Sequence, residues 1–317
     1  MNETRGGLGS QVARTALGCS DIGSGRVRVE LAFRAGAILG ESPVWDEQRR
    51  VLLCVDITRG LVFEFSSVTL PTVVCQLAPP VSALALGAVG EMLLALRRSV
   101  VIVDDRCDVV RAVTVFTDGP ASLRLNDGKV DPWGGFVVGT LDDTCAVPRN
   151  RLFRLSRSFD VSTRVEGLML SNGMGWSADR KHFYVVDSAR RTILHYDVDP
   201  DSGQMGRERS LVITELPGLP DGLAVDNEGC LWVAMWGGFE VRRYTPTGEL
   251  VLRLGLPVSL VTSLAFGGDG LDELYITTAR AGLTDEQVAS EPHAGDVFWA
   301  DIGISGPRTN RFGALND

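Results

Sequence analysis

The sequence lacks the hydrophobic segments that would insert the chain into a membrane or mark it for export. No apolar run among its 317 residues reaches the roughly 18 residues that a membrane span needs. The N-terminal residues also lack the compact apolar stretch of a secretory signal. These absences predict a protein without a membrane partner, and they favour a cytoplasmic location.

The cysteines show no pairing pattern. The six of them stand at positions 19, 54, 75, 107, 145 and 230, and no CxxC pair occurs. Cys54 and Cys75 lie inside strand-like runs, where a free thiol behaves as a small hydrophobic side chain. We therefore expect neither a disulfide framework nor a thiolate metal site. This expectation also favours the cytoplasm.

The chain has few of the residues that bind nucleic acid or build the common hydrolase motifs. Its 31 Lys and Arg are outnumbered by 40 Asp and Glu, and the net charge of -9 repels phosphate backbones. No nucleic-acid partner is therefore expected. Neither GxSxG nor HExxH occurs. The three histidines (His182, His195 and His293) share no motif, so we expect structural or exposed side chains rather than a His-rich zinc site.

Glycine, by contrast, is abundant and marks a repeat. Many of the 36 glycines stand beside Asp, Asn, Pro or Ser between apolar runs. Such pairs indicate tight turns between short strands. One unit recurs along the chain: an alternating apolar strand, a turn, a second strand, and a third strand that begins with polar or basic residues. Its copies begin at residues 42, 83, 127, 172, 221 and 262.

The repeat predicts an all-β fold, a six-bladed β-propeller with four-stranded blades. Its period of roughly 40 to 50 residues is the length of one blade. A β-sandwich is the alternative, but it does not explain six copies. We expect residues 1–27 to be a flexible N-terminal extension and residues 28–317 to form the propeller. We also expect RVRVELAF (26–33) to complete the last blade against GDVFWADI (295–302), because this pairing hides otherwise exposed strand edges.

Polar residues precede the first strand in four of these units. They are Glu41 in GESPVW, Asn126 in RLNDGK, Asn172 in LSNGMGW and Asp221 in LPDGLAV. The innermost strands of a propeller line its channel, so these positions should meet at one mouth. Singly, each is more typical of a turn residue. Together their oxygens suit one divalent cation, Ca²⁺ first, with Mg²⁺, Mn²⁺ or Zn²⁺ as alternatives.

Four longer strings resemble one known family, in order along the chain. They are GESPVWDEQRRVLLCVDI, RLNDGKVDPWGGFVVGTL, SNGMGWSADRKHFYVVDS and PDGLAVDNEGCLWVAMWGG. They are similar to the regucalcin, gluconolactonase and luciferin-regenerating family, and the resemblance runs from Val29 to Phe312. It implies a six-bladed propeller that binds one divalent cation and usually hydrolyses sugar lactones.

The resemblance also implies roles for particular residues. The family's metal ligands fall on Glu41, Asn172 and Asp221. Its substrate-contacting residues fall on Arg124 and Asn126, which moves Asn126 outward from the metal.

The sequence departs from the family's pattern in the third blade. Members often carry an acidic residue shortly after the Gly-Thr of this blade, and Thr144 occupies that position here, next to Asp142 and Asp143. This difference bears on the identity of the substrate.

The predicted function is a metal-dependent lactonase that takes a small-molecule sugar lactone. Asp221 would be both a metal ligand and the candidate general base for the attacking water. The alternatives are a metal-dependent esterase or phosphotriesterase, or a calcium- or ligand-binding propeller without turnover.

Overall fold

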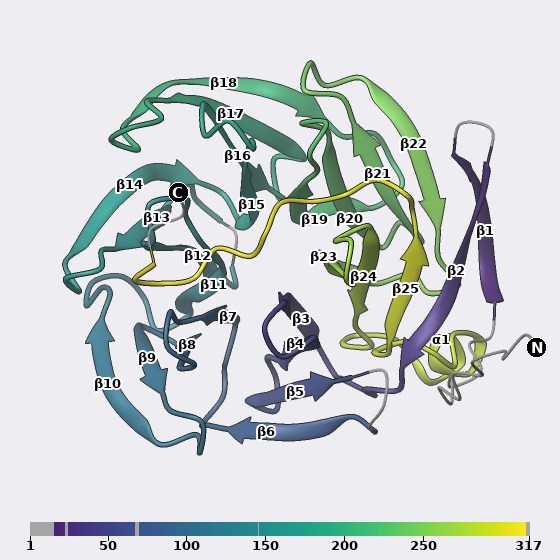
Figure 1. The fold of residues 1–317 in the computed structure, drawn as a ribbon, viewed down its shortest axis with the longest axis horizontal. Coiled ribbons are helices and arrows are strands. Elements are labelled where there is room, and N and C mark those ends of the chain that lie inside the picture. The colour runs from purple at the N-terminus through teal and green to yellow at the C-terminus, as the bar shows by residue number, and fades with distance from the viewer. Residues whose placement is uncertain (1–15, 23–24, 67–69, 145, 315–317) are drawn as a thin grey trace, which may run out of the picture.

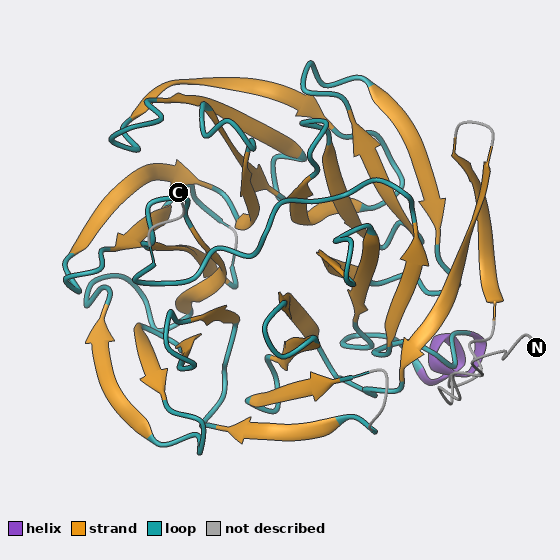
Figure 2. Cartoon of the chain, in the orientation of Figure 1, coloured by secondary structure: helices purple, strands orange, loops and turns teal. Residues whose placement is uncertain are grey.

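Six antiparallel sheets are arranged as blades around a central channel (Figures 1 and 2). The computed structural model describes residues 16–22, 25–66, 70–144 and 146–314. The first strand of each blade is innermost, and the innermost strands of neighbouring blades contact one another around the whole ring. The predicted six-bladed β-propeller is therefore confirmed. Within the described residues, no helix has the length and apolar character needed to cross a membrane.

The first five blades have four strands each, in chain order from the channel outward. Blade 1 contains β3 (Gly40–Asp46), β4 (Val51–Asp56), β5 (Leu61–Phe65) and β6 (Thr72–Gln76). Blade 2 contains β7 (Ala83–Leu86), β8 (Met92–Ala95), β9 (Ser99–Val103) and β10 (Val109–Thr114). Blade 3 contains β11 (Leu123–Val130), β12 (Phe136–Asp142), β13 (Asn150–Leu155) and β14 (Val161–Leu168). Blade 4 contains β15 (Ser171–Trp176), β16 (His182–Asp187), β17 (Thr192–Val198) and β18 (Met205–Ile213). Blade 5 contains β19 (Leu219–Val225), β20 (Leu231–Trp236), β21 (Glu240–Tyr244) and β22 (Leu250–Gly255).

Blade 6 joins the two ends of the chain. It contains β23 (Val261–Gly267), β24 (Glu273–Thr278), β25 (Val297–Asp301), β2 (Gly25–Phe33) and β1 (Ala16–Ile22), with the short helix α1 (Asp285–Ser290) between β24 and β25. Val29 in β2 pairs with Ala300 in β25. The closure expected between residues 26–33 and 295–302 is therefore confirmed.

Part of the segment expected to be a flexible extension (1–27) belongs to a sheet. β1 pairs with β2, which gives blade 6 a fifth strand. Residues 16–27 thus include paired strand residues, while residues 1–15 lie outside the described residues.

The packing between blades explains the sequence pattern. Successive side chains of a strand point to opposite faces, and each blade has a neighbour on both faces. The second strand of blade 1, VLLCVD, is buried along its whole length for this reason. Six apolar clusters fill the six interfaces between blades. Leu53 of blade 1 and Leu94 of blade 2, for example, are fully buried in one of them.

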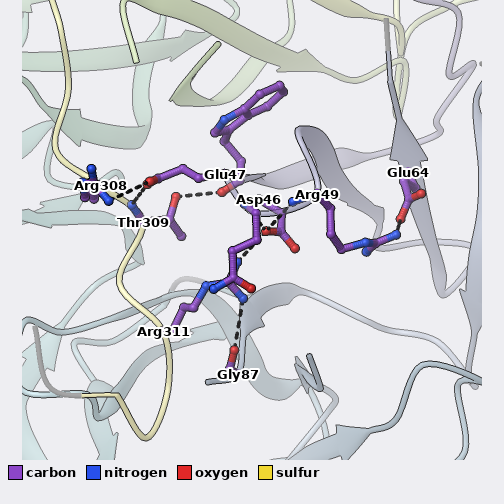
Figure 3. A network of polar contacts seen from close by, with 10 residues as sticks. Asp46, Glu47, Arg49, Glu64, Gly87, Arg308, Thr309 and Arg311 are labelled. Atoms are coloured by element: carbon purple, nitrogen blue, oxygen red, sulfur yellow. Dashed lines mark hydrogen bonds and ion pairs between the residues drawn. The ribbon is translucent and has the colours of Figure 1, made fainter. Parts of the chain in front are cut away.

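The C-terminal segment 302–314, called the crossing segment below, runs across the centre of the ring (Figure 1). Thr309 donates its backbone N–H to Glu47 Oε1 at 2.9 Å (Figure 3). Arg311 forms an ion pair with Asp46 in the same region. Both acceptors belong to the end of β3 and the turn after it, so the crossing segment is tied to blade 1 at one end of the channel.

Two cysteines form a disulfide that the sequence did not predict. Cys75 in β6 is bonded to Cys107, in the turn between β9 and β10, with a Cα–Cα distance of 5.2 Å. The bond joins the outer parts of blades 1 and 2. The expectation of a free, hydrophobic thiol at Cys75 is therefore wrong, whereas Cys54 is a buried free cysteine as expected.

Candidate metal centre

The predicted site residues lie on innermost strands, where regular pairing with the second strand is interrupted. Register shifts occur between Glu41 and Val44 in β3, Leu125 and Gly128 in β11, Ser171 and Met174 in β15, and Pro220 and Leu223 in β19. Glu41, Asn126, Asn172 and Asp221 stand at or within these interruptions. A bulge re-aims the side chains near it, and all four of these side chains are buried.

Glu41 is aimed by an unusual backbone conformation. The next residue, Ser42, has a φ of 49°, which a non-glycine residue seldom adopts. Its backbone N–H donates to Glu41 Oε2 at 3.0 Å, and its Oγ accepts the Leu84 N–H of blade 2 at 2.9 Å. The turn is therefore held from both sides. Glu41 lies close enough to Asp221 for that charge to raise its pKa.

Asn172 and Asp221 come from neighbouring blades, and the Asn172 side chain is close enough to lower the pKa of Asp221. Asn172 Nδ2 donates to Ser188 Oγ at 3.2 Å. Because this contact uses the amide nitrogen, the carbonyl oxygen Oδ1 remains for a cation. Glu41, Asn172 and Asp221 thus form one group contributed by blades 1, 4 and 5.

Arg124 and Asn126 lie beside this group and are joined to each other. Arg124 Nη1 donates to Asn126 Oδ1 at 2.9 Å, and Asn126 Nδ2 donates to the Ser171 carbonyl at 3.0 Å. The Arg124 charge is also near enough to lower the pKa of Glu41. The five residues predicted from the sequence are therefore brought together at one place.

Asp127 is a member of this group that the sequence reasoning missed. It is buried, and its charge raises the pKa of both Glu41 and Asp221. A regular strand would point Asn126 and Asp127 to opposite faces, but the interruption in β11 lets both contribute to the centre. In the sequence, Asp127 directly follows Asn126 in RLNDGK, and the alternation of a regular strand argues against both residues reaching one site.

The three carboxylates form an electrostatically unfavourable cluster by themselves. Burial is the main cause that raises the pKa of Glu41, Asp127 and Asp221, and neighbouring carboxylates raise the pKa of Glu41 and Asp221 further. The charge of Lys129 lowers the pKa of Asp127, but the Lys129 Nζ donates its hydrogen bond to the Leu223 carbonyl at 2.9 Å. Among the described residues, no basic side chain forms an ion pair with any of the three carboxylates. An all-oxygen group with excess buried negative charge fits a divalent cation.

Glycines allow the innermost strands to approach closely enough to form the centre. A Cβ on Gly173, which follows Asn172, would lie 2.1 Å from the Leu223 backbone nitrogen of blade 5. A Cβ on Gly222, which follows Asp221, would lie 2.2 Å from Ser263 Oγ of blade 6. In the sequence, the site was marked by polar residues that are each followed by a glycine. The glycine is needed at these positions because a side chain there would collide with the neighbouring blade.

Asp143 stands nearest to Arg124 at the place where the sequence departs from the family. Its carboxylate lies 3.7 Å from Arg124 Nε and is largely exposed. Asp142 instead accepts hydrogen bonds from Ser122 and Thr144 at 2.8 and 3.0 Å. Thr144 is thus turned toward Asp142, and Asp143 supplies the acidic group beside Arg124.

A cavity lies in the channel and touches the group of ligands through Asp127. It has a volume of about 640 Å³ and is lined by Ser42, Asp127 and Lys129 as well as by Pro307 to Asn310 of the crossing segment. Glu41 is the second residue of β3 and Asp46 is its last, so the crossing segment lies roughly 16 Å along the strand from the candidate centre. The segment therefore covers the opposite end of the channel.

Comparisons with known proteins identify the family. The SMP-30/Gluconolactonase/LRE-like region matches residues 39–280. Regucalcin from Gallus gallus is 35% identical over 288 residues, which cover 88% of this chain and 96% of the relative. The chain belongs to this family. The membership inferred from the four strings is therefore confirmed.

Solved structures of the SMP-30/gluconolactonase/LRE-like family share the fold. A luciferin-regenerating enzyme superposes with a TM-score of 0.78 at 29% identity, covering 87% of this chain and 95% of that one. A calcium-binding regucalcin from Agrobacterium tumefaciens has a TM-score of 0.83 at 23% identity, covering 94% and 97%. Both matches extend over nearly the whole propeller.

Proposed function

We propose that this protein is a divalent-metal-dependent lactonase that hydrolyses a sugar lactone to the hydroxy acid. The observation that carries the proposal is the convergence of Glu41, Asn172 and Asp221, beside Arg124 and Asn126, at one mouth of the channel. Membership in a family that includes gluconolactonases supports the same reaction class.

Glu41, Asn172 and Asp221 would hold the cation through their oxygens. Ca²⁺ is the first candidate, because carboxylate and carboxamide oxygens are its usual ligands and because the Agrobacterium relative is a calcium-binding protein. Mg²⁺, Mn²⁺ and Zn²⁺ are the alternatives. When bound, a divalent cation polarises a carbonyl oxygen and lowers the pKa of a coordinated water.

The side chains divide the remaining work of ester hydrolysis. Arg124 still has N–H groups to donate toward the oxygens of a sugar, and its contact with Asn126 fixes its orientation. Asp221 would accept a proton from the attacking water as a new carbon–oxygen bond forms at the carbonyl. The ring carbon–oxygen bond then breaks, and the ring oxygen takes the proton to become the hydroxyl of the product.

The test is a screen of sugar lactones against Ca²⁺, Mg²⁺, Mn²⁺ and Zn²⁺, with acid release followed by a pH indicator. Glu41→Gln should lower kcat/KM by at least about 100-fold, because it removes a charged ligand. Glu64→Gln is the matched control. Glu64 lies in β5 of the same blade and forms an ion pair with Arg49, away from the proposed ligands. Unchanged activity in Glu41→Gln would refute the proposed site.

The screen also separates the alternative functions. Calorimetric binding of Ca²⁺ without turnover of any lactone would favour a binding propeller, and turnover of phosphotriesters alone would favour the other hydrolase. The cytoplasmic location stays a prediction. One argument for this location was the lack of a cysteine pairing pattern. The Cys75–Cys107 disulfide weighs against that argument, because disulfides persist mainly in oxidising compartments.

A further inference from the structure

Two of the three histidines meet on the two middle strands of blade 4. His182 Nδ1 in β16 and His195 Nε2 in β17 are 3.0 Å apart. Asp197 Oδ1 lies 3.7 Å from His182 Nδ1 and 3.8 Å from His195 Nε2. Antiparallel pairing causes this meeting, because His182 is opposite Asp197 and His195 is opposite Tyr184. A sequence motif was therefore not needed to bring the two histidines together.

The three atoms have the spacing of ligands on one face of a tetrahedral metal site. Bonds of about 2.0–2.2 Å to Zn²⁺ place neighbouring ligand atoms about 3.4 Å apart. The observed separations of 3.0, 3.7 and 3.8 Å surround this value. We propose that His182, His195 and Asp197 form a surface site for Zn²⁺, with water as the fourth ligand, separate from the centre in the channel.

The neighbouring side chains orient these ligands. The Tyr184 ring stacks on the His195 ring, with centroids 5.1 Å apart and planes inclined by 20°. Arg209 pairs with Asp197 Oδ2 and leaves Oδ1 directed at the histidines. Such outer contacts commonly fix the tautomer and direction of metal ligands. The His182 and Asp197 side chains are 39% and 49% exposed, so an ion can reach them from solution.

The donor set selects a different class of ion from the channel centre. Two imidazoles and one carboxylate suit Zn²⁺ and similar transition metals, whereas the oxygen ligands of the channel suit Ca²⁺. Zn²⁺ would replace the hydrogen bond between the rings, and the proton moves to the other nitrogen of the donating ring. The ion then clamps β16 to β17.

The test measures bound metal in tag-free protein by equilibrium dialysis against Zn²⁺ and by the visible spectrum of bound Co²⁺. The starting protein carries Glu41→Gln and Asp221→Asn, so that the channel ligands are removed. It should bind one Zn²⁺ per chain and give a four-coordinate Co²⁺ spectrum. Adding His195→Gln should weaken this binding by more than about 100-fold, because a direct ligand is lost.

His293→Gln is the matched control, since this third histidine lies between α1 and β25 and contacts Asp296 instead. It should leave the stoichiometry and the spectrum unchanged. Zn²⁺ binding that survives His195→Gln, or no binding by the starting protein, would overturn the proposal. The same comparison in otherwise wild-type protein guards against misfolding of the channel variant, because His195→Gln alone should remove one bound Zn²⁺. Loss of Zn²⁺ in His195→Gln together with intact lactonase activity would show that the two sites are independent.

Discussion

Asp221→Asn should stabilise the protein in the absence of metal. Asp221 is buried next to Asp127 and Glu41, and its pKa is raised because burial and the Asp127 charge both disfavour the carboxylate. Asparagine has nearly the same shape but removes the charge. An uncompensated buried polar group costs about 1–3 kcal/mol. Over 317 residues the unfolding entropy is about 0.7 kcal/mol/K, so Tm should rise by about 2–4 °C.

The same substitution should remove the response to metal. Ca²⁺ at 100 times its Kd stabilises a protein with one site by about 2.7 kcal/mol. With the same unfolding entropy, the wild-type Tm should rise by about 4 °C. Asp221→Asn should show no such rise, because the variant lacks one of the two charged ligands.

The gain in stability should depend on pH in a defined direction. A carboxyl whose folded pKa is raised holds its proton in the folded state after the unfolded chain has released it. Metal-free wild-type protein should therefore lose stability as the pH rises from the ordinary values of 3.8 for Asp221 and 4.5 for Glu41 through their raised pKa values. The advantage of Asp221→Asn should grow over this range and vanish below it.

Asp226→Asn is the control, since Asp226 lies in the same blade and is also buried. Its carboxylate accepts hydrogen bonds from Trp232 Nε1 at 2.8 Å and from Arg243 Nε at 2.9 Å. Neutralising it should cost about 3 kcal/mol, or about 4 °C in Tm, and leave the calcium response intact. Scanning calorimetry in chelator and in Ca²⁺ measures both variants. A lower metal-free Tm for Asp221→Asn at neutral pH, or a preserved calcium shift, would refute the reasoning.

Two further predictions concern the contacts between blades. Gly173→Ala should weaken calcium binding and lower kcat/KM by about 100-fold. The added Cβ would lie 2.1 Å from the Leu223 nitrogen and would separate the strands that carry Asn172 and Asp221. An unchanged calcium affinity in calorimetry would contradict this. Replacing Cys75 and Cys107 by alanine should cost about 3–4 kcal/mol and lower Tm by about 5 °C, since the disulfide spans 32 residues. Reducing agent should lower the wild-type Tm by the same amount, and an unchanged Tm would contradict the stabilising role.

The fold was predictable because its causes repeat locally along the chain. Each blade needs alternating apolar strands and turns, so the pattern appears six times, and the pairing of residues 26–33 with 295–302 follows from the need to close the ring. Glu41, Asn172 and Asp221 were predictable because each stands at the start of such a strand.

Asp127 was not predictable, because the alternation rule sends it away from Asn126 and only the register shift in β11 overrides that rule. The Cys75–Cys107 bond and the meeting of His182 with His195 depend on neighbouring strands and blades, which leave no spacing motif in the sequence.

The pairing of β2 with β25 also sets the order in which a newly made chain can finish folding. β2 is synthesised well before β25, and β25 supplies the hydrogen bonds along one edge of β2. At the usual ribosomal rate of about 5–20 residues per second, this edge waits roughly 15–50 s for its partner. During that time blade 6 is incomplete, and an unpaired strand edge invites aggregation. The pairing of β2 with β25, which closes the ring, can thus form only late in synthesis.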